Sequence, residues 1–309
     1  HFVVCCVMHY SFCISPITLA TIHADSCPIR LDTAFDKILD ARSRFLPTLP
    51  YTHSYPPAQP FVQLIDIDIR ELIGLAKESS QNPLPEYASS IVAGLRKDAP
   101  EAVRKYVEGA VAIYSALRSM VARYGLSGLT LRCFDLLDAL GNTGCLALAL
   151  LNSEGIPSSC EGDVPALLSM AIGNALTGRS GFQANPSQID PGTGTMLLAH
   201  CTVPFNMVEK YSYNTHFESG IGVAIHGEMS EGDVTIFKTS ADLGRMFCEE
   251  ATLLENQYGR DLCRTQVLLQ MKNSVVLTEY YLKNPIGNHH IIFSGKHREV
   301  IEEFMKFIF

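Results

Sequence analysis

The sequence predicts an α/β protein in which Rossmann-like parallel-sheet units are followed by a β-rich, barrel-like C-terminal domain. Up to about residue 180, short apolar runs alternate with amphipathic stretches, which is the pattern of strand-and-helix units that build a parallel sheet. Beyond that point, short strand-like runs separated by Gly and Asn turns replace the long helical patterns. We therefore expect an N-terminal α/β portion over residues 1–60, an α/β domain over 61–180, and a β-rich domain with a terminal helix over 181–309.

The composition restricts the class of protein. The chain has 309 residues, of which 47% are hydrophobic and 18% charged, a balance that supports a sizeable core and excludes a disordered protein. The formal net charge of −8 and the lack of a Lys/Arg stripe exclude nucleic-acid binding through phosphate neutralisation. A small molecule is therefore the expected partner.

Ten cysteines are scattered along the chain without the spacing of a disulfide framework or a paired C-x-x-C zinc site. This distribution fits a reducing compartment, so we expect a cytoplasmic protein. The apolar run over residues 2–22 resembles a signal peptide or a membrane span, but it lacks a basic leading region and contains His9 and Pro16. We expect a buried strand and loop there, and no membrane association.

The first elements are predicted from apolar runs and the breaks between them. Residues 2–8 have the continuous apolar character of a buried parallel strand, and residues 32–46 fit a helix. The prolines between residues 49 and 60 interrupt regular structure and mark a boundary. A strand over 61–65 then leads into a helix over 68–77, which opens with a capping-box pattern.

The clearest helix is predicted over residues 98–124, where apolar residues recur at three- and four-residue steps and Gly125 ends the pattern. We interpret its apolar stripe as core. The next elements alternate as strand, helix, strand and helix, over residues 129–134, 143–152, 156–160 and 164–177.

The C-terminal third is predicted to consist mainly of strands, because short apolar and β-branched runs are separated by turn residues. Its last stretch, residues 297–308, is predicted to be a helix because Val300, Ile301, Phe304 and Ile308 share one face. The predicted strands cover residues 181–184, 195–201, 221–225, 234–238, 262–271 and 290–293.

The chemical centre is predicted where the strand over 156–160 meets the helix over 164–177. Glu161 follows the strand directly, at the edge of the sheet where α/β proteins bind ligands. Asp163 is placed to cap the helix, with Pro165 in its first turn. Glu161 comes too early for capping, so its charge indicates either solvation or function.

Polar and imidazole side chains also gather at the ends of other predicted strands. They are Asn185 and Asp190, His200, His216 and Glu218, and the pair His289 and His290. Oxygen and imidazole ligands together suit Mn²⁺ or another divalent first-row ion. Taken singly, His200 fits a satisfied core histidine and Glu218 a solvated charge. One of the two adjacent histidines faces the site, since neighbours in a strand point to opposite faces.

A thiol enzyme is a separate alternative. Cys160 lies beside Glu161, and Cys201 lies beside His200, so a nearby imidazole could lower a thiol pKa. No local signature supports this alternative, and buried cysteine is a common small core residue.

Five motifs occur in an order that resembles a known superfamily of sugar isomerases. They are Arg132-Cys133-Phe134-Asp135, Cys160-Glu161-Gly162-Asp163, Ala184-Asn185-Pro186, His200-Cys201-Thr202 and Gly287-Asn288-His289-His290. From about residue 98 to residue 309 the chain is similar to the L-fucose isomerase and L-arabinose isomerase superfamily, and within it to the shorter fucose-isomerase-like proteins.

The resemblance implies two α/β units followed by a β-rich domain, with a metal site between the second unit and that domain. It also implies a divalent metal, usually Mn²⁺, held by two acidic residues and a histidine. The implied reaction is that of an intramolecular oxidoreductase, an aldose-ketose isomerase that moves protons through an ene-diol of an open-chain sugar. Family members form trimers and hexamers, so a homo-oligomer is expected.

Residue by residue, Glu161 matches the first family carboxylate, which serves as ligand and base. Asn185 stands where the second acid is expected, and an amide cannot act as a base. We expect Asp190 to supply the missing charge, as second catalytic acid and metal ligand, if residues 185–190 fold back into the site; otherwise Asp163 or Glu218 would substitute. His289 matches the metal histidine better than His290.

The expected substrate-binding residues complete the site. They are Arg132, Asp163, Asn185, His200, His216 and Glu218. Among them, His200 resembles an additional metal-binding histidine of arabinose isomerases. Two functions follow from the resemblance. The first is a metal-dependent isomerase of a small sugar or sugar derivative. The second is a catalytically degenerate sugar-binding or regulatory protein that keeps the pocket.

Overall fold

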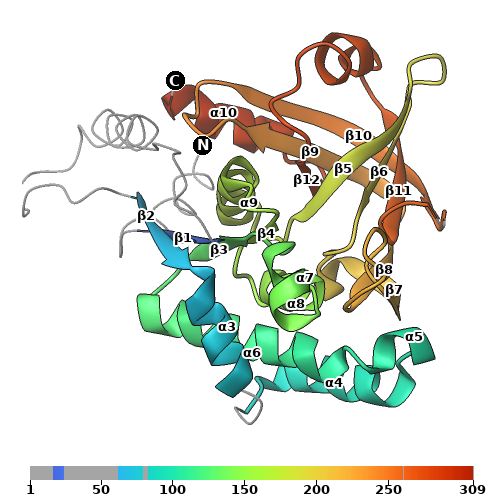
Figure 1. Cartoon of the computed structure of the whole chain (residues 1–309). Helices are drawn as coiled ribbons and strands as arrows, with labels where there is room; N and C mark the ends of the chain where they lie inside the picture. The colour runs from blue at the N-terminus through green and yellow to red at the C-terminus, as the bar shows by residue number, and fades with distance from the viewer. Residues whose placement is uncertain (1–16, 24–61, 79–82, 260, 309) are drawn as a thin grey trace, which may run out of the picture.

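The computed structural model describes residues 17–23, 62–78, 83–259 and 261–308 (Figure 1). The strand predicted over 2–8, the helix over 32–46 and the boundary at 49–60 lie outside these residues. Within them, a parallel sheet with helices and an antiparallel barrel follow one another along the chain, which confirms the mixed α/β class with a β-rich C-terminal part.

The parallel sheet has four described strands in the order β2-β1-β3-β4. They are β1 (Ile17–His23), β2 (Val62–Asp68), β3 (Gly128–Leu131) and β4 (Ser158–Cys160). β3 and β4 are buried along their whole length. Their short apolar and weakly polar sequences suit strands that helices cover.

Seven helices accompany the sheet in the described part of the chain. They are α3 (Ile69–Glu78), α4 (Glu86–Asp98), α5 (Glu101–Arg104), α6 (Val107–Tyr124), α7 (Asp135–Leu140), α8 (Cys145–Ser153) and α9 (Val164–Thr177). The helix predicted over 98–124 is therefore two helices, α5 and α6, with a break at Lys105 and Tyr106. Gly125, with φ of 61°, ends α6 as predicted.

The barrel is closed, with strand order β10-β11-β6-β5-β12-β9. Its strands are β5 (Phe182–Asp190), β6 (Thr195–His200), β9 (Gly232–Thr239), β10 (Met246–Gln257), β11 (Thr265–Met271) and β12 (His290–Ser294). A separate two-stranded sheet pairs β7 (Val208–Asn214) with β8 (Ala224–Met229). The short helices η1 (Phe205–Met207) and η2 (Leu277–Tyr281) and the terminal helix α10 (Arg298–Ile308) complete this part.

Helix α9 connects the two parts. It packs against β3 and β4 of the sheet on one side and against β9 and β12 of the barrel on the other (Figure 1). The approach to β12 is close, because a Cβ atom on Gly173 would lie only 2.1 Å from Cζ of Phe293. The N-terminus of α9, which follows Glu161, therefore lies beside the barrel.

No helix within the described ranges combines the length and the apolar character that crossing a membrane requires.

Candidate functional site

Glu161 lies in a tight turn between β4 and α9. Its φ is 63° and that of Gly162 is 69°, so two successive residues have left-handed backbone conformations. For a residue with a side chain this conformation costs about 1–2 kcal/mol, and such strain is often found at functional sites. A Cβ atom at position 162 would lie 2.7 Å from Cγ of Arg132, so the turn also needs glycine for space. The strained turn fixes where the Glu161 carboxylate lies.

Asp163 caps α9, as the sequence predicts, and also serves two other groups. Its Oδ1 accepts the backbone N–H of Ala166 at 2.7 Å. Its Oδ2 lies 2.8 Å from Nδ1 of His289 and 3.1 Å from Nζ of Lys238. Burial raises the pKa of the Asp163 carboxyl, but His289 and Lys238 outweigh burial and hold this pKa at about 2. The carboxylate is therefore charged and fully engaged.

His289 is buried between two carboxylates. Nδ1 faces Asp163, whereas Nε2 lies 3.4 Å from Oε2 of Glu161. This contact is an ion pair when the imidazole is protonated, although Nε2 has no hydrogen-bond partner among the described residues. Burial lowers the pKa of His289, but Asp163 and Glu161 more than offset this and raise it to about 9. A histidine whose Nδ1 is held by one carboxylate and whose Nε2 faces a second carboxylate without a hydrogen bond has the arrangement of a metal ligand.

His200, at the end of β6, is a second histidine beside Glu161, and its ring centroid lies 5.4 Å from that of His289. It is buried, its Nδ1 is 2.9 Å from Oγ1 of Thr202, and its Nε2 is 3.8 Å from Oε1 of Glu161. Burial lowers the pKa of His200, so the imidazole is mainly neutral at pH 7. Burial also opposes ionisation of Glu161, but His200 and His289 together hold the pKa of that carboxyl well below its usual range.

Asn185 lies on the face of β5 that is directed toward Glu161. Gln183, two residues earlier and therefore on the same face, accepts the backbone N–H of Cys160 at 2.8 Å. In the antiparallel pair of β5 and β12, Ala184 is opposite His290, which brings the next residues, Asn185 and His289, alongside each other. Oδ1 of Asn185 is buried without a hydrogen-bond partner among the described residues.

Two buried atoms without a hydrogen-bond partner among the described residues, Asn185 Oδ1 and His289 Nε2, thus accompany the Glu161 carboxylate. Leaving a buried polar atom unpaired costs about 1–3 kcal/mol, so such atoms are uncommon in folded proteins. An amide oxygen, an imidazole nitrogen and a carboxylate form a donor set that suits a divalent first-row cation. The residues present therefore fit a metal ion.

Asp190 does not reach this site. The expected loop over residues 185–190 is instead strand, because β5 continues to Asp190 with a bulge after Pro186. Asp190 pairs with Thr195 at the far end of the β5–β6 hairpin, about 16 Å along the strand from Asn185. Its Oδ1 accepts the backbone N–H groups of Gly192 and Thr193 at 2.9 and 3.3 Å, so its charge stabilises a turn.

The other expected substrate-binding residues lie around Glu161 at differing distances. Arg132 follows β3, crosses Gly162 and is 45% exposed. His216 is buried, with Nδ1 3.1 Å from Oγ of Ser219. Burial lowers the pKa of His216, and the carboxylates of Glu218 and Glu161 act in the opposite direction, so both are near the imidazole. Glu218 itself is exposed.

His290 faces away from Glu161. Its Nε2 is 2.9 Å from the hydroxyl of Tyr280, and its Nδ1 is 3.1 Å from the carbonyl oxygen of Asn288. Burial lowers the pKa of His290 to about 3, so this imidazole is neutral. The two adjacent histidines therefore have different surroundings, and His289 is the one that faces the carboxylates.

Sequence reasoning missed Lys238, Gln183 and Cys133. Lys238 is completely buried on β9, and its sequence signal is a lone cation at the end of the predicted strand over residues 234–238. Gln183 is a buried amide next to Asn185. Cys133 lies with its Sγ 2.8 Å from that of Cys160, although the two are far apart in sequence.

The six described cysteines that the structure shows as free thiols do not favour a thiol enzyme. They are Cys133, Cys145, Cys160, Cys201, Cys248 and Cys263. The hydrogen bond to Cys133 and burial both raise the pKa of Cys160, so its nucleophilic thiolate form is suppressed at neutral pH. Nevertheless, Cys160 Sγ, a Glu161 oxygen and a His200 nitrogen all lie within 4.8 Å of one another.

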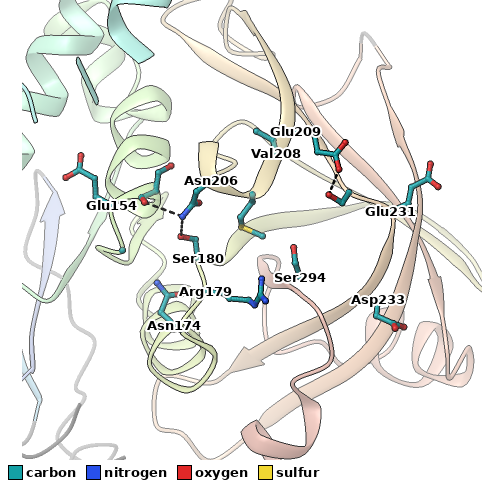
Figure 2. Close-up of a pocket in the computed structure, with 15 residues that line it drawn as sticks. Glu154, Asn174, Arg179, Ser180, Asn206, Val208, Glu209, Glu231, Asp233 and Ser294 are labelled. Atoms are coloured by element: carbon teal, nitrogen blue, oxygen red, sulfur yellow. Dashed lines mark hydrogen bonds between the residues drawn. The ribbon is translucent and has the colours of Figure 1, made fainter. Parts of the chain in front are cut away.

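A pocket of about 830 Å³ lies at the opposite end of α9 (Figure 2). It is bordered by the C-terminal ends of α8 and α9, where Asn206 donates to Oγ of Ser180 at 2.9 Å and to the carbonyl oxygen of Ser153 at 3.3 Å. Because α9 has 14 residues and is therefore about 21 Å long, this pocket is separate from the Glu161 site.

The chain is similar to proteins named sulfoquinovose isomerase. It is 31% identical to one from Clostridium sp. (strain MSTE9) over 154 residues, which are 46% of this chain and 34% of that protein. It is 25% identical to one from Alkalicoccus urumqiensis over 181 residues, 56% of this chain and 40% of that protein. For one from Priestia aryabhattai the identity is 24% over 208 residues, 60% of this chain and 46% of that protein.

The matched regions cover less than half the length of each of these relatives. No protein-family model matches the chain.

Proposed function

We propose that the chain belongs to a metal-dependent aldose-ketose isomerase that acts on a small sugar or sugar derivative through an ene-diol. The observation that carries this proposal is a pair of buried atoms, Asn185 Oδ1 and His289 Nε2, that have no hydrogen-bond partner among the described residues and lie beside the Glu161 carboxylate. The names of three relatives, all sulfoquinovose isomerases, support a sugar isomerase independently of the geometry. Sulfoquinovose is therefore the first sugar to test.

The proposed metal ligands are Glu161, Asn185 and His289, and the proposed metal is Mn²⁺. Two oxygen donors and one imidazole suit this ion better than a soft one. When bound, the metal would polarise the carbonyl and hydroxyl oxygens of the sugar and stabilise charge that develops on them. Asp163 acts one step away, because it holds Nδ1 of His289 and so directs Nε2 to the ligand position.

Glu161 is the proposed base. Its carboxylate is ionised at neutral pH, so an oxygen is available to accept the proton from the carbon next to the sugar carbonyl. Asp190 lies on a distant turn, and Asp163 is engaged by its neighbours. Glu161 would therefore also return the proton to the adjacent carbon. The neutral imidazole of His200, 3.8 Å away, is placed to accept or donate a hydrogen bond during this transfer.

The sugar would lie between Glu161 and the solvent-exposed Arg132. Arg132, His200 and His216 supply hydrogen-bond donors from three different segments around the carboxylate. Glu218, exposed and near His216, is placed at the rim. Several donors and acceptors at fixed positions are what a polyhydroxy substrate requires.

A sugar-binding or regulatory protein is the second candidate function. The observation that favours it is Asn185, because the amide occupies the position where the resemblance places a second acid. Such a protein would be stabilised by a sugar through binding alone, without turnover. A rise in melting temperature with sugar and the absence of any product would support this candidate.

The substitution Glu161→Gln tests the isomerase directly. We expect turnover to fall by about 10²–10⁴-fold, the usual contribution of a general base, while the fold is kept. Metal content should also fall, since a carboxylate ligand is lost. The measurements are product formation from a sugar panel that includes sulfoquinovose and elemental analysis of the purified protein.

The matched control is Glu255→Gln, which changes an exposed glutamate on β10 in the same way. Its turnover and metal content should equal those of the wild type. Unchanged turnover and metal content in Glu161→Gln would refute the proposed function.

A further inference from the structure

Cys160 is a buried thiol that the proposed chemistry does not use. It is the last residue of β4 and is 2% exposed. Its Sγ lies within 4.8 Å of a Glu161 oxygen and of a His200 nitrogen, and these two also lie within that distance of each other. Three different metal-ligating atoms thus converge at Glu161, in the same pocket as His289, whose ring centroid lies 5.4 Å from that of His200.

Further sulfur atoms surround this point. Cys133 Sγ is 2.8 Å from Cys160 Sγ, so the Cys160 sulfur has a thiol neighbour that can donate a hydrogen bond to it. Cys145 and Cys201 form a small buried cluster with Cys263 packed against it. Charge on Cys133 and Cys145 acts on Cys160, which places all three thiols in one region. The donor set that includes Cys160 is therefore softer than the set of Glu161, Asn185 and His289.

The geometry points to a binding site for a thiophilic divalent ion such as Zn²⁺, formed by Cys160, Glu161 and His200. Cysteine sulfur, carboxylate oxygen and imidazole nitrogen are all zinc ligands, and three protein ligands with one open position are typical of catalytic zinc sites. His200 suits this role because Thr202 holds its Nδ1 at 2.9 Å, which leaves Nε2 directed at Glu161. On binding, the Cys160 S–H bond breaks, a sulfur–zinc bond forms and one proton leaves to the solvent.

This site and the proposed catalytic site share one carboxylate. Oε1 of Glu161 faces His200 and Oε2 faces His289, and the two imidazole rings lie 5.4 Å apart between centroids, so both ligand sets use the same carboxylate in one pocket. Softness separates the two ligand sets, because manganese prefers the oxygen-rich set and zinc the set with the thiol. Zinc at Cys160 therefore inhibits the manganese-dependent reaction, a consequence that rests on the proposed function.

Cobalt substitution tests the site without any substrate. Metal-free protein is titrated with Co²⁺, and the near-ultraviolet spectrum is recorded, since a cobalt–thiolate bond gives a charge-transfer band there. We expect the band in the wild type and its loss when Zn²⁺ is added. In Cys160→Ala the band should be absent and zinc affinity should fall by more than about 100-fold, because even outer-shell partners of a metal contribute about 10–100-fold.

The matched control is Cys248→Ala, which removes a buried thiol from a separate core cluster next to Phe237 and Ile301. The band should persist in this variant. Absence of the band in the wild type overturns the inference, and this result does not depend on whether Cys160→Ala folds. Persistence of the band in folded Cys160→Ala also overturns it.

The outcomes distinguish this site from the proposed function. Manganese-dependent turnover without a sulfur band leaves the isomerase intact and removes the zinc site. A sulfur band without turnover of any sugar supports the zinc site and removes the isomerase. If both hold, the zinc concentration that halves turnover should rise at least about tenfold in Cys160→Ala.

Discussion

Lys238 shows how much a single side chain contributes to the site. Its Nζ contacts both carboxylate oxygens of Asp163, at 3.1 and 3.2 Å, and the side chain is completely buried. Replacing Lys238 with methionine leaves the charge of Asp163 with His289 and the N-terminus of α9 as its main partners. We expect the free energy of unfolding to fall by about 3–5 kcal/mol, as when one partner of a buried ion pair is removed.

Denaturant unfolding of Lys238→Met and of a control measures this effect. The control is Lys283→Met, because Lys283 pairs with Glu279 on the exposed surface of the chain. A surface pair contributes about 0–1 kcal/mol, so the control should differ little from the wild type. Equal losses in both variants would contradict the role that we assign to Lys238.

His289 makes metal binding depend on pH. In the metal-free protein its pKa is raised to about 9, so its imidazole carries a proton at pH 7 that a metal at Nε2 must displace. Affinity should therefore increase by up to about tenfold per pH unit from pH 7 to pH 9 and then level off. Titration calorimetry in buffers of different ionisation enthalpy would detect the released proton.

The stability of the metal-free protein depends on pH in the opposite direction to metal affinity. The raised pKa means that the His289 ion pairs stabilise the metal-free fold fully below pH 6.5, and that this contribution is lost as the pH rises through 9. Metal affinity that did not change between pH 7 and pH 9 would show that His289 is not a ligand.

At the scale of single elements, the sequence predicts best where local signals agree. The helix predicted over residues 164–177 is observed as α9 (Val164–Thr177), because Asp163, Pro165 and Gly178 mark its ends. The helix α4 (Glu86–Asp98) is absent from the predictions although Ile91, Val92 and Leu95 are buried on one face. Pro83 and Pro85 lie directly before this helix, and prolines indicate a loop, so the local sequence does not mark where the helix begins.

The misplacement of Asp190 also has a local cause. Pro186 lies inside β5, and proline usually ends a strand, so the predicted strand stops at residue 184. In the structure a bulge after Pro186 accommodates the proline and the strand continues. Asp190 therefore belongs to a turn and not to the site. Local sequence does not predict this, because the extent of β5 depends on its pairing with β6.

The contact between α9 and β12 gives a prediction at this scale. In Gly173→Ala the new Cβ would lie 2.1–2.9 Å from ring atoms of Phe293, so the helix or the ring must move. We expect the free energy of unfolding to fall by about 1–3 kcal/mol, as for other overpacked cores. The control, Gly94→Ala in α4, meets no atom within 4 Å and should instead stabilise the helix by about 0.5–1 kcal/mol.

Urea unfolding of the two variants measures both effects. A Gly173→Ala variant as stable as the wild type would mean that α9 and β12 are less closely packed than the structure indicates. Since α9 also carries Asp163 at its N-terminus, a shift of this helix should weaken the site as well.

For the whole molecule, the site depends on contacts between distant segments. Glu161 and Asp163 come from the end of the parallel sheet, whereas Asn185, His200 and His289 come from the barrel. Asp163 and His289 are 126 residues apart in the chain. Sequence motifs identified the residue types, but only the register of β5, β6 and β12 determines which of them meet.

The expected homo-oligomer, a trimer or hexamer, stays a prediction. The sequence predicts separate domains over residues 61–180 and 181–309. In the structure, α9 belongs to the first range and packs against both the sheet and the barrel. Glu161 lies where these two parts meet, so each part contributes to the proposed chemistry.

The most direct test of the central proposal is solvent exchange at the sugar carbon. Manganese-loaded protein is incubated in deuterated water with sulfoquinovose and with other sugars, and deuterium in the recovered sugar and product is measured by mass spectrometry. We predict that one deuterium enters at the carbon next to the carbonyl and that Glu161→Gln lowers its rate by about 10²–10⁴-fold. Product formed at the same rate by both proteins, or no deuterium with any sugar, would contradict a proton transfer carried by Glu161.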